Sequence, residues 1–357
     1  MTQKVSVDFH PKFLHDNFGV DFGEAYHADP FLRAREWRRV QQELHNRFGQ
    51  YGLFPAPAAE HAGVLDGIGI QPLDFLNAAL GGRLEFMPAE AVWTPDKPLS
   101  HIETLDDVRA LPEIDWETEP LYRNLLAQYE QLRAADPAGR PTGLQCAFHA
   151  GGDEAILITH SSYTTAFRLL GDRIFELMMF EEEVAMALFE YIYRQYRRQA
   201  EHFCRLAGWR ITKIHFGDCA ATMLSPDWFE RFNLVLAEKI IGEGGYTGCV
   251  QHSCGPSSHL LESFTRIPKL EELQLGYGTD LAQARRLFPD TRIIAFYSAA
   301  ALLNESPEQI GANLERMAAE LQDHYQIVGS SFDPATPPDH LTAFLETAQL
   351  LNAAGTP

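Results

Sequence analysis

Residues 292–329 read RIIAFYSAAALLNESPEQIGANLERMAAELQDHYQIVG, which is an apolar run, a capped helical pattern and a second apolar run. Ser306 and Pro307 predict where the helix begins, because Ser caps free backbone N–H groups and Pro is tolerated in a first helical turn. We expect strands at 292–296 and 326–329 on either side of this helix. A strand, a helix and a second strand in this order predict a parallel pair joined by a right-handed crossover.

The same alternation continues toward the N-terminus. Apolar runs that favour strands recur between helical patterns, and the strongest helical pattern, 181–207, is amphipathic with acids in its first turn. A long series of such units favours a barrel over an open sheet. We therefore expect an α/β fold, a (β/α)8 TIM barrel with an N-terminal helical extension, folded as a single domain over residues 1–357. The other runs expected to be strands are 5–9, 142–149, 211–216, 247–252 and 272–275.

Composition limits the classes of partner. The chain has 357 residues, 45% of them hydrophobic, so it can bury a large core, and its formal net charge of -20 repels phosphate backbones and anionic lipids. We therefore expect a small-molecule substrate, and neither nucleic acid nor a membrane as a partner. No apolar run reaches transmembrane length and no secretory signal is visible, so we expect a cytoplasmic protein.

The sharpest local signal is the segment 250–256, VQHSCGP, at the end of an apolar run. In a strand His252 and Cys254 project to the same side, and Gly255-Pro256 then ends the strand. Active sites of α/β barrels lie at this end of the strands, and zinc favours such a nitrogen and sulfur pair. The alternative is a chance spacing of a core cysteine, because two ligands do not make a metal site.

A second segment, 213–219, closes the preceding predicted strand and reads KIHFGDC. If the two strands are neighbours, Cys219 lies beside His252 and could complete a set of metal ligands. Asp218 is a candidate catalytic residue: it could act as a general base, bind the metal, orient His252, or only cap the following turn. His215 is a candidate for substrate binding.

Other candidates rest on position alone. His149 follows an apolar run and is a second catalytic candidate, whereas His10, Tyr297 and Asp280 are substrate-binding candidates at the ends of other predicted strands. For each lone histidine the alternative is a hydrogen-bonded structural residue, and Asp280 could be only a helix cap. The sequence has no dinucleotide-binding glycine motif, P-loop or hydrolase elbow. The five cysteines, without an export signal, indicate core thiols, metal ligands or reactive groups rather than a disulfide framework.

Several segments, clearest between 167 and 345, resemble the uroporphyrinogen decarboxylase superfamily. That resemblance implies an α/β barrel, in agreement with the alternation of strands and helices. The segments that carry it are Leu170-Gly171-Asp172, Gly217-Asp218, Met223-Leu224-Ser225-Pro226, His252-Ser253-Cys254-Gly255, Gly278-Thr279-Asp280-Leu281 and Thr336-Pro337-Pro338.

The resemblance points to one branch of that superfamily. True uroporphyrinogen decarboxylases carry an arginine-rich N-terminal signature that binds substrate carboxylates, and the corresponding residues 8–14 here contain no arginine. The chain is closer to the zinc-dependent methyltransferases that act with corrinoid proteins and thiols, such as the methylcobalamin:coenzyme M methyltransferases. Their motif implies His252 and Cys254 as metal ligands, followed by a cysteine near the chain end. Ser331 stands in that place, so we expect Cys219, or else Asp218, to replace the missing ligand unless the metal has been lost.

These observations lead to one expected function and two alternatives. We expect a metal-dependent methyltransferase that uses zinc or iron and moves a methyl group between a small donor or a corrinoid and a thiol. A corrinoid-carrying protein is the expected partner, and a homodimer is the default assembly. The first alternative is a metal-free decarboxylase or carbon–carbon lyase in which Asp218 stabilises a developing cation. The second is a barrel that binds a ligand without turnover.

Overall fold

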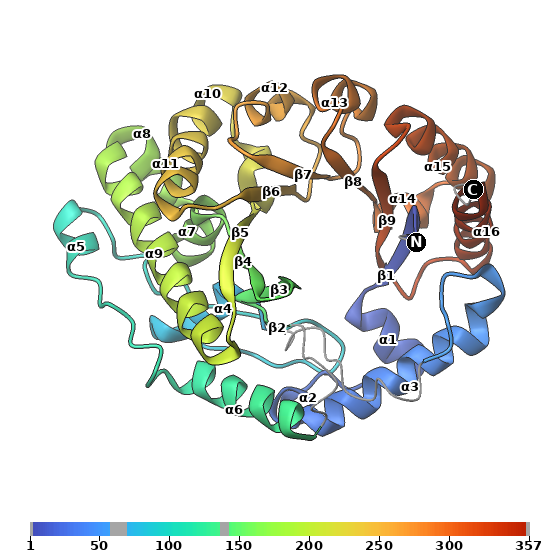
Figure 1. Cartoon of the computed structure of the whole chain (residues 1–357), viewed down its shortest axis with the longest axis horizontal. Coiled ribbons are helices and arrows are strands. Elements are labelled where there is room, and N and C mark those ends of the chain that lie inside the picture. Colours follow the sequence, from blue (N-terminus) through green and yellow to red (C-terminus); the bar gives the residue numbers. More distant parts are fainter. Residues whose placement is uncertain (1–2, 58–69, 136–142, 355–357) are drawn as a thin grey trace.

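The computed structural model describes residues 3–57, 70–135 and 143–354. Nine strands form one curled sheet, and helices surround its convex face (Figure 1). The spatial order is β1-β9-β8-β7-β6-β5-β4-β3-β2. The strands are β1 (Val5–Phe9), β2 (Gly143–Leu144), β3 (Ala147–Gly151), β4 (Glu154–His160), β5 (Arg210–Gly217), β6 (Gly248–Ser253), β7 (Leu270–Leu275), β8 (Arg292–Tyr297) and β9 (Tyr325–Phe332).

The helices divide into an N-terminal set and a set that alternates with the strands. In Figure 1 the N-terminal helices α1, α2, α3 and α6 occupy the side of the molecule between β1 and β2. The N-terminal set is α1 (Pro11–Phe18), α2 (Glu24–Ala28), α3 (Pro30–Phe48), η1 (Gly49–Tyr51), α4 (Pro72–Ala79), α5 (Leu105–Arg109) and α6 (Pro120–Ala135). The alternating set is α7 (Ser162–Leu170), α8 (Arg173–Phe180), α9 (Glu182–Ala207), η2 (Cys219–Met223), α10 (Pro226–Trp228), the π-helix η3 (Phe229–Leu234), α11 (Val235–Gly244), η4 (Ser258–Leu260), α12 (Leu261–Phe264), α13 (Leu281–Leu287), α14 (Ala299–Asn304), α15 (Pro307–Leu321) and α16 (Pro338–Ala354).

The expected α/β architecture is confirmed, but the closed eight-stranded barrel is confirmed only in part. Strands β1 and β4–β9 are parallel, as successive strand–helix units require. Strands β2 and β3 form an antiparallel hairpin on the edge of β4. Within the part of the chain that the structure describes, no pairing joins β2 to β1, so the sheet there is a curled wall and not a closed ring.

The hairpin corrects the single parallel strand expected at 142–149. Gly151 and Gly152 have φ of 120° and 59°, and these left-handed conformations allow the tight turn after which β4 runs back along β3. Two helix starts predicted from the sequence are confirmed. Ser306 accepts a hydrogen bond from the backbone of Gln309 in a capping box, and Ser225 caps the backbone N–H of Trp228.

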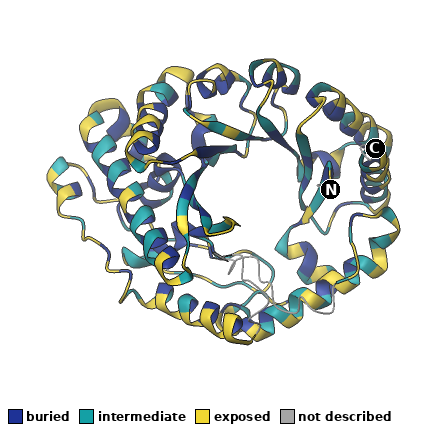
Figure 2. Cartoon of the chain, in the orientation of Figure 1, coloured by how far each residue is buried: buried dark blue, intermediate teal, exposed yellow. Residues whose placement is uncertain are grey.

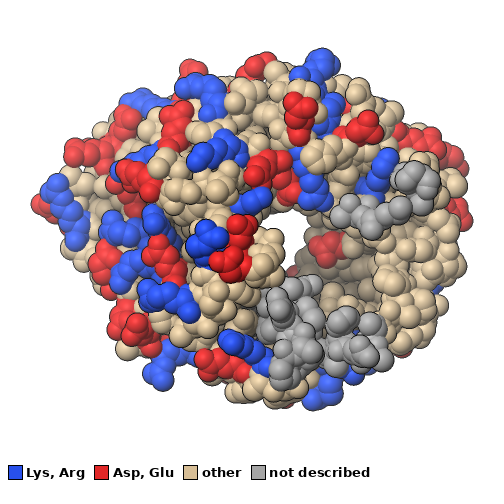
Figure 3. All heavy atoms as spheres, in the orientation of Figure 1, with Lys and Arg blue, Asp and Glu red and all other residues tan. Residues whose placement is uncertain are grey.

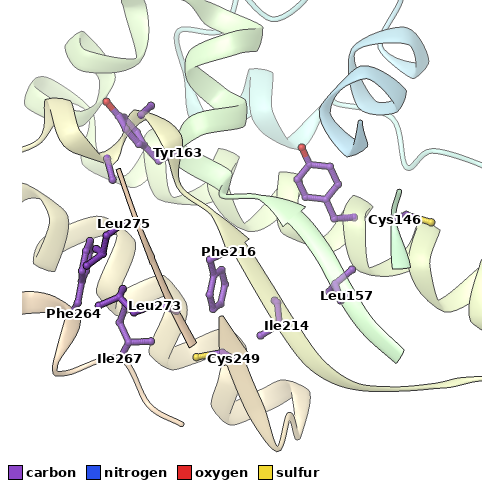
Figure 4. Packing of buried hydrophobic residues seen from close by; sticks show 14 of the residues in the cluster. Cys146, Leu157, Tyr163, Ile214, Phe216, Cys249, Phe264, Ile267, Leu273 and Leu275 are labelled. Atoms are coloured by element: carbon purple, nitrogen blue, oxygen red, sulfur yellow. The ribbon is translucent and has the colours of Figure 1, made fainter. Parts of the chain in front are cut away.

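The hydrophobic core lies between the convex face of the sheet and the helices (Figure 2). On β5 the side chains of Ile214 and Phe216 are buried on this side, and so are those of Leu273 and Leu275 on β7, with β6 between the two strands (Figure 4). Because side chains alternate along a strand, His215 and its neighbours in register point to the concave face instead. In the space-filling view the middle of the molecule is hollow (Figure 3). Charged side chains of both signs are interspersed over the visible face.

Candidate metal centre

Strands β5 and β6 bring the predicted ligands together at their carboxyl ends. Gly217 pairs with His252 in register, so the chain that leaves β5 passes directly beside the end of β6. The backbone N–H of Asp218 donates to the carbonyl oxygen of His252 at 2.9 Å and continues this contact beyond the strand. Cys219 follows at the start of η2, and Cys254 is the first residue after β6. The expectation that the two segments are neighbours is therefore met.

Three side chains form a compact group at this edge. The ligand atoms of Cys219, His252 and Cys254 all lie within 4.8 Å of one another. The two sulfur atoms are 2.8 Å apart, and the Nε2 atom of His252 is 2.9 Å from the Sγ atom of Cys254. Among the described residues, no other His, Cys, Asp or Glu belongs to such a group. Cys254 is exposed, so the group is open to a small molecule on one side.

The group favours ionisation of one thiol. The hydrogen bond from Cys219 lowers the pKa of Cys254 to about 5, with the bond and charge of His252 acting in the same direction. The same hydrogen bond raises the pKa of Cys219. Burial alone would lower the pKa of His252, but its contacts with Cys254 outweigh burial and raise it. Cys254 is thus prepared as a thiolate, which is the form that binds metals.

Neighbouring strands fix the orientation of the His252 ring. The Nδ1 atom of His252 is 2.8 Å from the Oε1 atom of Gln274 on β7, an acceptor that requires the proton on Nδ1. The amide of Gln274 in turn donates to Glu272 at 2.6 Å, and Glu272 is paired with Arg292 on β8. This leaves Nε2 as the ligand atom. Such outer partners fix the tautomer of metal-bound histidines in proteins.

The donor set fits a catalytic metal site of the zinc type. Zinc in enzymes is held by three protein ligands from His, Cys and carboxylates, with one position left for water or substrate. One imidazole, two thiols and an open side match that pattern. A mixed set of nitrogen and sulfur ligands also suits other divalent transition metals, of which iron was expected as the alternative to zinc.

Asp218 lies next to Cys219 in sequence but faces the other side of the sheet. Its carboxylate is buried and accepts hydrogen bonds from Ser161, Thr164 and Asn233, the last at 2.6 Å. Burial raises the pKa of Asp218, while these bonds oppose the rise. The carboxylate ties the end of β5 to α7 and to the π-helix η3. The structure does not bring it into the group of metal-ligand candidates.

Three other predicted residues lie away from the group. His149 sits on the antiparallel strand β3, beside Ala155 at the beginning of β4, with its ring 5.2 Å from that of Trp209. This is the opposite end of the sheet from His252. Tyr297 is fully buried, and its hydroxyl donates to Glu305. Asp280 is exposed and caps α13 by accepting from Gln283 at 2.8 Å, the structural alternative considered for it.

His10 and His215 remain on the same side as the group. His10 follows β1, and its backbone N–H donates to Phe332 at the end of β9, so it lies at the carboxyl edge of the sheet. The ring centroids of His215 and His252 are 5.9 Å apart. Ser331 adopts a left-handed φ of 57° where β9 has one residue more than β1 between their paired positions. The structure therefore has a bulge at the place where the resemblance implies a cysteine.

Two residues of the site escaped the sequence analysis. Gln274 orients His252, and His160 lies at the end of β4, where burial and the nearby charges of His215, His252 and Arg168 lower its pKa. The sequence does contain a signal for His160, because it ends the apolar run EAILITH, but that run was not assigned to a strand. Gln274 could be identified only from the register of β7 against β6.

A curled parallel sheet with polar side chains at the carboxyl ends of its strands is the arrangement of barrel-type α/β enzymes. Within that class, the model of the family "Uroporphyrinogen decarboxylase (URO-D)" matches residues 153–350, more than half of the chain, and the chain belongs to this family. Among solved structures, a methyltransferase from Methanosarcina mazei is similar over 98% of this chain and 95% of its own, with a TM-score of 0.62 and 15% sequence identity. At this identity the likeness concerns the fold. A comparison with curated protein sequences finds no significant match.

None of the described helices is long and apolar enough to cross a membrane.

Proposed function

We propose that the protein is a metal-dependent methyltransferase that transfers a methyl group between a small methyl donor or a corrinoid and a thiol. The observation that carries the proposal is the group of Cys219, His252 and Cys254 at the carboxyl edge of the sheet. Membership of the URO-D family and the likeness in fold to a methyltransferase support it. The same family supports a complete (β/α)8 barrel over the single domain 1–357.

In this proposal Cys219 replaces the family's late cysteine. The backbone bulge at Ser331 carries a hydroxyl, which is a weak zinc ligand beside a thiolate. Cys219, just after β5 at the start of η2, supplies a second sulfur beside His252 and Cys254, so the ligand count stays at three. We propose zinc as the metal, with iron as the alternative.

The chain's own residues prepare the reaction. A divalent metal held by the three side chains supplies Lewis acidity that favours the thiolate form of a thiol substrate. Gln274 keeps the Nε2 atom of His252 directed at the centre, and exposed Cys254 leaves access for the thiol. In the transfer, the thiolate sulfur forms a bond to the methyl carbon, and the bond between methyl and donor breaks with its electron pair on the donor. The thiol proton is released, and a partner protein would deliver any corrinoid donor.

No described contact favours the lyase alternative. That mechanism needs Asp218 near the substrate, but its carboxylate is buried on the helix side and bound by three side chains. A protein that binds a ligand without turnover would need no open position beside a thiolate.

Elemental analysis of the purified protein tests the proposal directly. We expect about one equivalent of metal in the wild type, and loss of metal in Cys219→Ala, His252→Ala and Cys254→Ala. Cys249→Ala is the matched control, because Cys249 lies on β6 but is buried and bonded to Pro268 on the core side. The metal-loaded protein is then assayed for transfer of methyl from methylcobalamin to a thiol.

The outcomes separate the alternatives. Metal retained in Cys219→Ala but lost in the other two variants would contradict Cys219 as the replacement ligand. Wild-type protein that neither contains nor takes up a stoichiometric transition metal would sink the proposed function and return the lyase to first place.

A further inference from the structure

The two cysteines of the candidate metal centre leave the sheet side by side. Gly217 and His252 are paired in register on β5 and β6, and Cys219 and Cys254 each follow two residues later. Neighbouring strands lie about 4.7–4.9 Å apart. The Cα atoms of cysteines joined by a disulfide are about 4.4–6.8 Å apart. The end of this strand pair therefore holds the two cysteines within reach of a disulfide bond.

Their side chains also point toward each other. The Sγ atoms of Cys219 and Cys254 are 2.8 Å apart, although both residues are free cysteines. A bond between these atoms needs an adjustment of the two side chains and no displacement of β5 or β6. Two thiols in such contact can be held together in two ways: both can bind one metal ion, or they can bond to each other.

The position of Cys219 makes this pairing possible. Ser331, where the resemblance implies the second cysteine, lies on β9, and β7 and β8 separate β9 from β6. A cysteine there would not share a strand pair with Cys254. Cys219 instead follows the strand adjacent to β6, so the replacement of a metal ligand also creates a pair of neighbouring thiols.

Exposure differs among the five cysteines of the chain. Cys254 is exposed and Cys219 is half-buried, whereas Cys146, Cys204 and Cys249 are buried. Exposed cysteines beside a second thiol are the ones that oxidise reversibly, because the second thiol resolves the oxidised sulfur as a disulfide. A dissolved oxidant therefore reaches Cys254 first and finds Cys219 next to it.

We propose that Cys219 and Cys254 form a reversible disulfide when no metal bridges them and a peroxide is present, which makes the candidate metal centre an oxidation-sensitive modification site. The proposal goes beyond methyl transfer, because it needs only the two thiols and the oxidant. The disulfide removes both sulfur ligands and leaves His252, and a single imidazole is too few ligands for a metal centre of this kind. Oxidation thus prevents metal binding, and reduction restores it.

The reaction proceeds in two balanced steps. The Cys254 thiolate attacks one oxygen of the peroxide, and the bond between the two oxygens breaks with its electron pair on the leaving oxygen. With hydrogen peroxide this gives a sulfenic acid on Cys254 and, once the thiol proton is taken up, water. The Cys219 sulfur then attacks the Cys254 sulfur. The bond between sulfur and oxygen breaks, and the oxygen leaves with the Cys219 proton as a second water.

Oxidation of the metal-free protein tests the proposal. Metal is removed with a chelator, hydrogen peroxide is added in small steps, and free thiols are counted in denaturant with a chromogenic reagent. The count should fall from five by the two paired thiols after about one equivalent of peroxide. It should return to five after dithiothreitol. Mass spectrometry of peptides should show Cys219 joined to Cys254 within one chain, and the oxidised protein should take up Zn²⁺ only after reduction.

Two variants separate the paired thiols from the others. In Cys219→Ala no second thiol resolves Cys254, so peroxide should convert Cys254 to a sulfinic acid that dithiothreitol does not reverse. Cys249→Ala is the matched control, because Cys249 is buried on the core side of β6. It should lose and recover two thiols, as the wild type does. The mapping of the wild-type disulfide stands even if one of these variants fails to fold.

The outcomes distinguish this inference from the proposed function. Wild-type protein in which Cys254 becomes a sulfinic acid or bonds to a second chain, while Cys219 stays a thiol, would overturn the inference. Reduced protein that binds metal but forms no disulfide with peroxide would also overturn it and leave the proposed function intact. The disulfide in a protein that takes up no metal even when reduced would support the inference and count against the proposed function.

Discussion

Buried titratable side chains lie on both faces of the sheet, and they differ in their hydrogen bonds. On the convex face, Asp218 is buried and bound by Ser161, Thr164 and Asn233. On the concave face, His160 and His215 keep ring nitrogens without partners. The difference holds for these titratable groups and not for every polar group, because Thr212 and Gln251 on the convex face also keep side-chain atoms without partners. The paired carboxylate joins elements of the fold, whereas the imidazoles lie beside the group of metal-ligand candidates.

Neighbouring residues of β5 provide the largest test of this contrast. Phe216→Ala should lower the free energy of unfolding by about 3–5 kcal/mol, because it removes a buried ring from the core between sheet and helices. His215→Ala, one position earlier on the other face, should cost less than about 1 kcal/mol. Urea unfolding of both variants measures the difference. Equal losses would show that the concave face is as important for stability as the convex face.

The second-largest expected effect is a change in the free energy of unfolding with pH. Asp74 is the third residue of a capping box on α4, and burial raises its pKa to about 7 from 3.8. Because the folded state holds this proton more tightly than the unfolded chain does, protonation of Asp74 stabilises the fold. This stabilisation is complete below the pKa of Asp74 in the unfolded chain and is lost as the pH rises through its pKa in the folded protein. Between pH 4 and pH 7 the wild type should therefore lose stability relative to Asp74→Asn, by roughly 3 kcal/mol or less.

Asp107 is the matched control for Asp74. It holds the same capping-box position on α5 but is only partly buried, and its hydrogen bonds to Thr104 lower its pKa. The ionised Asp107 carboxylate should instead stabilise the fold. This stabilisation is present above the pKa of Asp107 in the unfolded chain and is lost as the pH falls through its pKa in the folded protein. Unfolding curves of Asp74→Asn and Asp107→Asn, recorded across this range, should diverge from the wild type in opposite directions. Parallel curves would contradict the difference in burial.

A smaller effect is expected from the residue that orients His252. Gln274→Leu should weaken metal binding about 10- to 100-fold, because the imidazole loses the acceptor for its Nδ1 proton. Competition with a chelator of known affinity measures the change, and Gln42→Leu on the exposed face of α3 serves as control. Unchanged affinity in Gln274→Leu would show that packing alone holds the ring.

The smallest effect concerns the ion pairs of the concave face. A double-mutant cycle with Lys213→Met and Glu271→Gln should give a coupling of about 0.2–1 kcal/mol, since both side chains are partly exposed. Coupling near zero would mean that Lys213 is free to bind an anion.

Local signals predicted much of the fold. Helix starts at Ser225 and Ser306 could be read because capping depends on residues three positions apart. The meeting of Cys219 with His252 and Cys254 followed from assuming that successive parallel strands are neighbours. The direction of β3 could not be read, because a short apolar run does not reveal which way it pairs. His149 was therefore expected at the wrong end of the sheet.

Residues whose role depends on the register between strands could not be predicted from the sequence. Tyr297 ends its strand as expected, but alternation along β8 turns it into the core, where it meets Glu305. Gln274 lies opposite His252 only because β7 pairs with β6 in one particular register. A shift of one residue would have placed Leu273 or Leu275 there.

The place of Cys219 has a consequence for how the protein folds. All three metal-ligand candidates lie between residues 219 and 254, on the single β5–α11–β6 unit. A ligand on β9 would have delayed the centre until the C-terminal strands had joined the sheet. With the ligands close in sequence, loop closure costs little, and the metal can bind an early, partly folded chain. Metal present at the start of refolding should then accelerate formation of this unit, whereas metal added at the end only occupies a finished site.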